Sequence, residues 1–123
     1  MSKRILMIDD DQEMIDLGRL ILEKQGYEVL AAYSGEEGLA LLHHTPVDLV
    51  LLDIMMLGMD GWQVLSEIKA DKKLCHIPVI MLTARHYLED EAQTAAYADK
   101  FVGYVVKPFV VRELLQKIEE ALL

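Results

Sequence analysis

Little in this chain could cross-link it or hold it in a membrane. Cys75 is the single cysteine, which excludes an intrachain disulfide and a cysteine-based zinc site and makes a reducing cytoplasm the expected location. No apolar run approaches the roughly 18 residues that a membrane-spanning helix needs. The apolar run 5–8 is too short for the core of a signal peptide. We therefore expect no membrane span and no secretory leader.

Positive charge is scarce as well. The chain has 12 lysines and arginines against 21 aspartates and glutamates, which gives a formal net charge of −9. Nucleic-acid binding through phosphates and docking on anionic membranes both need a basic face. We therefore predict no direct contact with nucleic acid or membrane, and we interpret the charge as an aid to solubility.

Repeats, low-complexity segments and linker-like stretches are also missing. With 123 residues, 53% of them hydrophobic, the chain has the size and apolar content of one packed domain. We therefore predict a single domain over residues 1–123.

The apolar residues that are present alternate between two periods. Short, strand-like runs are separated by segments with helical spacing. The predicted strands are 4–8, 27–31, 47–52, 77–82 and 102–106, and the predicted helices lie at about 12–25, 35–45, 60–70, 87–100 and 111–122. Near-continuous apolar strands joined by helices predict an α/β fold, (βα)5 and doubly wound. We expect a five-stranded parallel sheet of order 2-1-3-4-5 with five helices covering both faces.

Residues at the predicted helix ends support these boundaries. Asp11 and Asp60 are suited to cap helix N-termini. Ser34 and Glu37 have the offset of a capping box. Gly26 suits the end of the first helix.

Carboxylates follow two strands that this order makes neighbours. Asp9, Asp10 and Asp11 follow the first strand, and Asp53 follows the third. Ligands bind at the carboxyl ends of strands in open α/β sheets, so these acids should converge. Like charges a few ångströms apart repel, and a hard divalent cation such as Mg²⁺ relieves the repulsion. We expect Asp11 to be a helix cap rather than a ligand.

A hydroxyl and an ammonium group are predicted at the same edge. Thr83 and Ala84 follow the fourth strand, and Lys107 and Pro108 follow the fifth. These residue types suit phosphoryl transfer: carboxylates hold Mg²⁺, one carboxylate attacks phosphorus, and the hydroxyl and ammonium bind phosphoryl oxygens.

Over nearly its whole length the chain resembles the receiver domain of two-component response regulators. The resemblance is carried by Asp9, Asp10, Asp53, the run Gly58-Met59-Asp60-Gly61, Thr83, Ala84, Tyr104 and the run Lys107-Pro108-Phe109. It implies that Asp53 is the phospho-acceptor. It implies that Asp10, Asp53 and the backbone carbonyl of Met55 bind Mg²⁺ directly, and that Asp9 acts through a metal-bound water.

The resemblance also implies roles around the phosphoryl group. Thr83 and Lys107 would bind it, and the small Ala84 would leave it room. Tyr104 would be an aromatic switch that turns inward when Thr83 moves. The Lys107–Pro108 peptide bond is expected to be cis.

The function implied is a phosphorylation-controlled signalling switch. A sensor histidine kinase or a phosphotransfer protein would supply the phosphoryl group. The face formed by the fourth helix, fifth strand and fifth helix would then act on a downstream protein or on an output domain outside this sequence. A homodimer is possible. The chain would be no enzyme beyond its own phosphorylation and slow autodephosphorylation.

Met55 and Arg85, each two residues past a site residue, would shield the acyl phosphate from water.

Three other functions compete with this one. A phosphohydrolase of the haloacid dehalogenase type needs a second aspartate two residues after the nucleophile, where this chain has Met55. A flavodoxin-like binder of FMN needs a glycine- and hydroxyl-rich loop after the first strand, where this chain has three aspartates. A receiver-like scaffold that is never phosphorylated is the third alternative.

The chain departs from the receiver pattern at three places. Leu57 stands where the family usually has proline, in the loop after Asp53. The stretch 99–103 lacks the common Gly-Ala-Asp-Asp pattern, and Val110 replaces a typical capping residue. Separately, the histidines show no metal-ligand spacing and are expected on the surface: His43, His44, His76 and His86.

Overall fold

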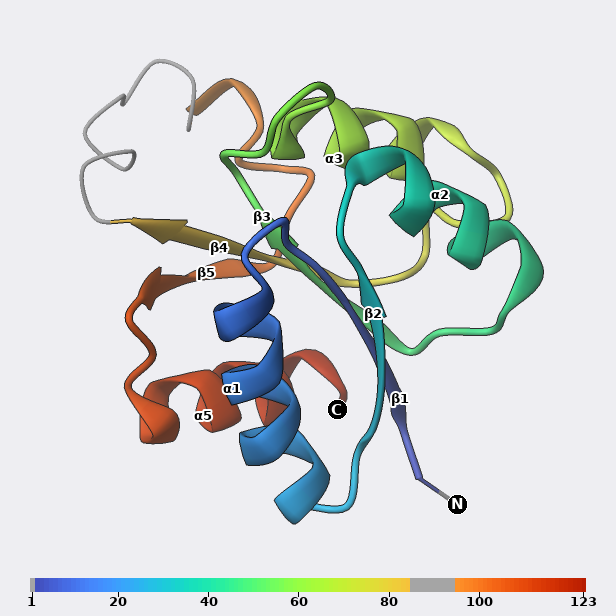
Figure 1. The fold of residues 1–123 in the computed structure, drawn as a ribbon. Helices are drawn as coiled ribbons and strands as arrows, with labels where there is room; N and C mark the ends of the chain where they lie inside the picture. The colour runs from blue at the N-terminus through green and yellow to red at the C-terminus, as the bar shows by residue number, and fades with distance from the viewer. Residues whose placement is uncertain (1, 85–94) are drawn as a thin grey trace.

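The computed structural model describes residues 2–84 and 95–123. From β1 to β4 strands and helices alternate along the chain, and β5 is followed by a helix (Figure 1). The elements are β1 Arg4–Ile8, α1 Gln12–Lys24, β2 Glu28–Ala32, α2 Gly35–His44, β3 Leu49–Asp53, α3 Gly61–Ala70, β4 Val79–Ala84, β5 Gly103–Lys107 and α5 Val111–Ala121. The helix predicted at 87–100 lies largely outside the described residues, and 97–100 form a turn.

The strands form one parallel sheet of order β2-β1-β3-β4-β5, which confirms the predicted topology. Helices α1 and α5 cover one face, and α2 and α3 cover the other (Figure 1). The arrangement is the flavodoxin-like α/β fold. Its four described helices leave the fifth predicted helix untested.

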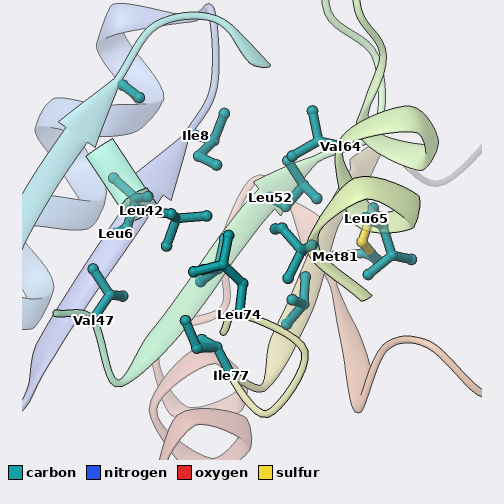
Figure 2. Close-up of a cluster of buried hydrophobic side chains, with 14 of the residues drawn as sticks. Leu6, Ile8, Leu42, Val47, Leu52, Val64, Leu65, Leu74, Ile77 and Met81 are labelled. Carbon is teal, nitrogen blue, oxygen red and sulfur yellow. The ribbon is translucent and has the colours of Figure 1, made fainter. Parts of the chain in front are cut away.

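Side chains of the central strands alternate between the two faces. In β1, Ile5 and Met7 pack toward α1 and α5, and Leu6 and Ile8 pack toward α2 and α3. All five residues of β3 are buried. Figure 2 shows the cluster beneath α2 and α3, where Leu52 and Met81 lie among leucine and valine side chains. Burying one such side chain contributes about 1.5–3 kcal/mol, so this core holds the strand ends in place.

Most of the predicted caps are confirmed. Asp11 accepts the backbone N–H of Glu13 at 3.0 Å, and Asp60 forms a complete capping box with Gln63 at 3.0 and 2.8 Å. Gly26 has a φ of 89°, as expected after a helix end. Val110 gives α5 no side-chain cap.

One predicted cap differs in detail. Ser34 does accept the N–H of Glu37 at 3.1 Å. The Glu37 carboxylate, however, accepts the N–H of Tyr33 at 3.3 Å rather than that of Ser34. The reciprocal half of the box therefore lies one residue earlier.

β1 ends at Ile8 as predicted, and the other four strands end one or two residues later than predicted. Asp53 is the last residue of β3 and pairs with Leu82, and Lys107 is the last residue of β5 and pairs with Ala84. Asp53 and Lys107 were expected to follow the strands because their side chains are polar. Backbone pairing does not depend on side-chain polarity, so the ladder continues through them.

Aromatic side chains join α3 to the segment that leads into β5. The Trp62 ring stacks on Tyr97 at a centroid distance of 4.8 Å, and Phe101 is tilted against it at 5.9 Å. No helix in the described residues is long and apolar enough to cross a bilayer.

Gly61 sets the distance between α3 and the end of β3. A Cβ at this position would collide with the backbone carbonyl of Asp53 and with the Cα of Ile54. Backbone cannot move aside as a flexible side chain can. Only glycine therefore lets the helix start this close to Asp53.

We predict that Gly61→Ala lowers the free energy of unfolding by about 2 kcal/mol or more, since overpacking against fixed atoms displaces backbone. Gly103→Ala is the matched control, because its Cβ would meet only the Lys117 side chain at 3.6 Å. Urea unfolding monitored by circular dichroism compares the two. Equal stability of both variants would show that α3 shifts freely at this point.

Candidate functional site

Three polar side chains are buried at the carboxyl edge of the sheet. Asp9 is fully buried, Asp53 is 5% exposed and Thr83 is fully buried. They are contributed by the end of β1, by β3 and by β4, whose register places them at one edge. The convergence predicted from the sequence is thus confirmed in space.

Asp9, Asp10 and Asp53 form an acidic cluster. One carboxylate oxygen from each lies within 4.8 Å of the others. Hard oxygen ligands at this separation suit a divalent cation such as Mg²⁺. The Asp9 Oδ2 atom is buried, and its partner among the described residues is the Lys107 ammonium, which leaves the cluster with three carboxylates and one cation. The donor set therefore fits such an ion.

Lys107 joins two of the three carboxylates. Its Nζ lies 2.6 Å from Asp9 Oδ2 and 3.1 Å from Asp53 Oδ1. Its side chain is only 17% exposed, so water screens these contacts weakly. The predicted meeting of ammonium and carboxylates is present, and the Lys107–Pro108 peptide bond is cis as expected.

Burial dominates the electrostatics of Asp53. Desolvation, followed by the Asp9 charge, raises the pKa of Asp53 from 3.8 to about 7, although Lys107 opposes the shift. For Lys107, burial lowers the pKa, but the hydrogen bond to Asp9 and both carboxylate charges outweigh it, so the net pKa is raised. Lys107 therefore stays cationic at neutral pH, where Asp53 is divided between its two forms.

Asp10 and Asp11 separate in space. Asp10 is exposed, and its Oδ2 accepts the backbone N–H of Leu57 at 3.1 Å. Asp11 caps α1 and is not a member of the cluster, as predicted. Asp9 Oδ1 accepts the N–H of Asp11 at 3.0 Å, which fixes the Asp9 side chain in the turn between β1 and α1.

Thr83 and Tyr104 are not arranged for direct contact with the carboxylates. Thr83 Oγ1 donates to the carbonyl of Ala84 at 2.8 Å. Tyr104 is 46% exposed on β5. The inward position of the expected aromatic switch is therefore not adopted in this structure.

Of the two residues predicted to shield the site, Met55 lies among the described residues. The Met55 side chain is 54% exposed in the loop after β3. Arg85 lies outside the described residues. His43, His44 and His76 are exposed as predicted, while His86 is also outside the described part.

The hydrogen bond from the Leu57 N–H to Asp10 was not predicted from the sequence. A backbone donor leaves no side-chain signature. Only the absence of proline at position 57 makes the hydrogen bond possible.

A hollow of about 520 Å³ lies away from this site, between the end of α2 and the turn before β4. Its lining includes His43, His44, Lys73 and His76 over a floor of Leu42 and Ile77. The acidic cluster lies at the opposite ends of the strands, so this hollow is not part of the candidate site.

A comparison with protein families matches residues 5–119 to the response regulator receiver domain. The chain belongs to this family. The acidic cluster and the cis Lys107–Pro108 bond are thus found in a receiver domain of the expected fold.

Individual relatives are also response regulators or receiver domains. The Heme response regulator HssR of Staphylococcus epidermidis is 40% identical over 117 residues, which are 95% of this chain and 50% of that protein. The chain thus spans about half the length of this curated relative. A CheY-like receiver domain protein of Methanospirillum hungatei has a TM-score of 0.87 and 34% identity, covering 99% of this chain and 94% of its own. Response regulator protein TrrA of Thermotoga maritima, solved in complex with Mg(2+)-BeF, has a TM-score of 0.82 and 38% identity, covering 97% and 98%.

The raised pKa of Asp53 has a consequence for stability in metal-free buffer. The folded state binds a proton more tightly than the unfolded state, so this group's contribution to stability falls as pH rises from about 4 to about 7. At pH 8 we expect Asp53→Asn to be more stable than the parent chain by about 1–2 kcal/mol. At pH 5 only the folded state still holds this proton and the loss has just begun, so the gain should fall to roughly a third of its value at pH 8.

Urea titrations at both pH values, with a chelator present, measure this difference. Asp16→Asn is the matched control, because it removes the same charge from an exposed position on α1. A gain for Asp53→Asn that is equal at pH 5 and pH 8 would contradict the assignment.

Proposed function

We propose that this chain is a phosphorylation-controlled switch in which Asp53 accepts a phosphoryl group with the help of Mg²⁺. The single observation that carries the proposal is the buried Asp53 carboxylate, held 3.1 Å from the Lys107 ammonium within a cluster of three carboxylates. Family membership supports it, and so does the relative solved in complex with Mg(2+)-BeF.

The cation would be held by Asp10, Asp53 and the backbone carbonyl of Met55, with Asp9 acting through a bound water. When bound, Mg²⁺ would offset the carboxylate charges and the charge of the incoming phosphoryl group. Asp10 and Asp53 lie within the observed cluster, and Met55 lies in the loop directly after β3.

The chain's own residues have distinct tasks in the transfer. A carboxylate oxygen of deprotonated Asp53 attacks phosphorus and forms the new O–P bond, while the bond from phosphorus to the donor breaks and its electrons leave with the donor. Lys107 already lies beside the attacking carboxylate and would pair with a phosphoryl oxygen. Asp9, which Lys107 also contacts, keeps the ammonium at this position.

Thr83 would connect phosphorylation to the rest of the fold. Its hydroxyl now donates to the Ala84 carbonyl, and rotation about χ1 would redirect it to a phosphoryl oxygen. The movement would leave space for Tyr104, now 46% exposed, to turn inward. The surface of β5, α5 and the helix predicted at 87–100 would change, which is the two-state shift expected of a phosphorylation switch.

The donor and the target are proposed at the level of class. A sensor histidine kinase or a phosphotransfer protein would supply the phosphoryl group. The target would be a downstream protein, an output domain of a longer chain, or a second copy of this one. We retain the cytoplasm as the proposed location. A phosphohydrolase is not favoured, since Met55 occupies the position where such an enzyme needs its second aspartate.

The test is incubation with Mg²⁺ and acetyl phosphate, followed by intact-mass spectrometry. We expect one phosphoryl adduct that hydroxylamine removes, and none for Asp53→Asn or without Mg²⁺. Asp11→Asn is the matched control, because asparagine also caps helices and Asp11 lies outside the cluster. It should be labelled like the parent chain.

Other outcomes point elsewhere. Steady release of phosphate with turnover would favour a hydrolase. No adduct from acetyl phosphate and none from a panel of histidine kinases would favour a scaffold that is never phosphorylated.

Met55 should control how long the phosphoryl group persists. Its apolar side chain lies two residues past Asp53 and would hinder water from reaching the acyl phosphate. We expect Met55→Asn, which keeps the backbone carbonyl and adds a polar group able to hold water, to speed loss of the phosphoryl group severalfold. Phosphate release after removal of the phosphodonor measures the rate, with the distant exposed Leu20→Asn as control. An unchanged rate for Met55→Asn would exclude the shielding role.

A further inference from the structure

One hydrogen bond joins two loops that are far apart in the sequence. The backbone N–H of Leu57 donates to Asp10 Oδ2 at 3.1 Å, across 47 positions of the chain. Leu57 lies in the loop between β3 and α3, and Asp10 lies in the turn between β1 and α1. The bond therefore joins the loop after β3 to a member of the acidic cluster.

One backbone hydrogen bond and one glycine turn determine the course of the loop that carries Leu57. It closes through the N–H of Gly61 on the carbonyl of Ile54 at 2.8 Å, and it turns at Gly58, whose φ is 76°. Between these points, residues 55–59 make no other hydrogen bond to another element of the described chain. Met56 and Met59 anchor the loop in the core beneath α2 and α3, and within the described chain the Leu57–Asp10 bond is the hydrogen bond that ties the exposed middle of the loop to another element.

The side chain of Leu57 contributes little to this arrangement. It is 88% exposed, so it buries almost no apolar surface. Asp10 is exposed too, and without a partner its carboxylate would sample several rotamers. The amide proton, rather than the leucine side chain, restricts it.

We propose that the backbone N–H of Leu57 is a positioning group that holds Asp10 and the Met55 loop ready for a divalent cation. The inference rests on the Mg²⁺ site of the proposed function. An N–H on Oδ2 leaves the other carboxylate oxygen free to coordinate, and donors behind a ligating carboxylate fix its orientation. Because Leu57 is two residues after Met55, the same bond would hold two ligand sources in one geometry.

The hydrogen bond to Asp10 requires only that residue 57 has a backbone N–H. Any residue except proline has the N–H. The receiver domains that the chain resembles usually have proline here, so they cannot form this bond. In this chain the loop contacts the carboxylate that we propose as a metal ligand.

The test compares two substitutions by calorimetric titration with MgCl2. Leu57→Ala keeps the N–H and should bind Mg²⁺ within about twofold of the parent chain. Leu57→Pro removes the N–H and should weaken binding about tenfold, the usual effect of losing a donor to a metal ligand. Semisynthesis with an ester at position 57 removes the N–H without a proline ring, and it should weaken binding to a similar extent even if the proline variant folds poorly.

A second readout needs no metal. In metal-free protein the Leu57 amide should be protected from hydrogen exchange, and Asp10→Ala should abolish the protection. Protection that survives Asp10→Ala would overturn the proposal, as would ester and proline variants that bind Mg²⁺ like the parent. Equal weakening by Leu57→Ala and Leu57→Pro would also overturn it, because the side chain would then be responsible. A parent chain that binds no Mg²⁺ would instead refute the metal site of the proposed function.

Discussion

The site depends on one ammonium group shared by two buried carboxylates. Lys107 lies within 3.1 Å of both Asp9 and Asp53, and little water reaches any of the three. Removing the ammonium would cost about 3–5 kcal/mol, because both buried carboxylates would be left without a counter-charge. The local arrangement of β1, β3 and β5 is therefore tied to the chemistry. Burial disfavours the charged form of Asp53 and so raises its pKa. The same burial excludes water and thereby strengthens the attraction between Asp53 and Lys107.

The sheet order is what makes this sharing possible. With β1 beside β3, the two acidic strand ends are neighbours, and β4 separates β3 from β5. The register pairs Ala84 with Lys107 and Leu82 with Asp53, so Lys107 lies two positions farther along than the acceptor. A long, flexible lysine stem covers that offset, which a shorter cation would not. Gly61 lets the loop after β3 return close to the same edge.

Much of this could be predicted because it follows from patterns with a physical cause. Apolar runs separated by helical periods predicted the sheet order, and the caps at Asp11 and Asp60 were evident from residue type and offset. Strand ends were predicted too early because pairing continues through Asp53 and Lys107 despite their polarity. The donor to the Glu37 carboxylate is Tyr33 rather than the predicted Ser34, a difference of one residue that sequence offset alone does not resolve. The Leu57 hydrogen bond could not be predicted, since a backbone donor has no residue signature. The roles of Thr83 and Tyr104 remain predictions, because both lie in positions from which they would have to move.

The stacked aromatic side chains give the chain a built-in optical reporter. Trp62 is the sole tryptophan, is 5% exposed, and lies in the first turn of α3, next to the glycine that contacts the Asp53 carbonyl. Its ring rests on Tyr97 and Phe101, which precede β5. Indole emission responds to the polarity and packing of its surroundings. Any rearrangement that reaches either the acceptor edge or the entry to β5 will therefore alter one fluorophore, without a label and without interference from a second.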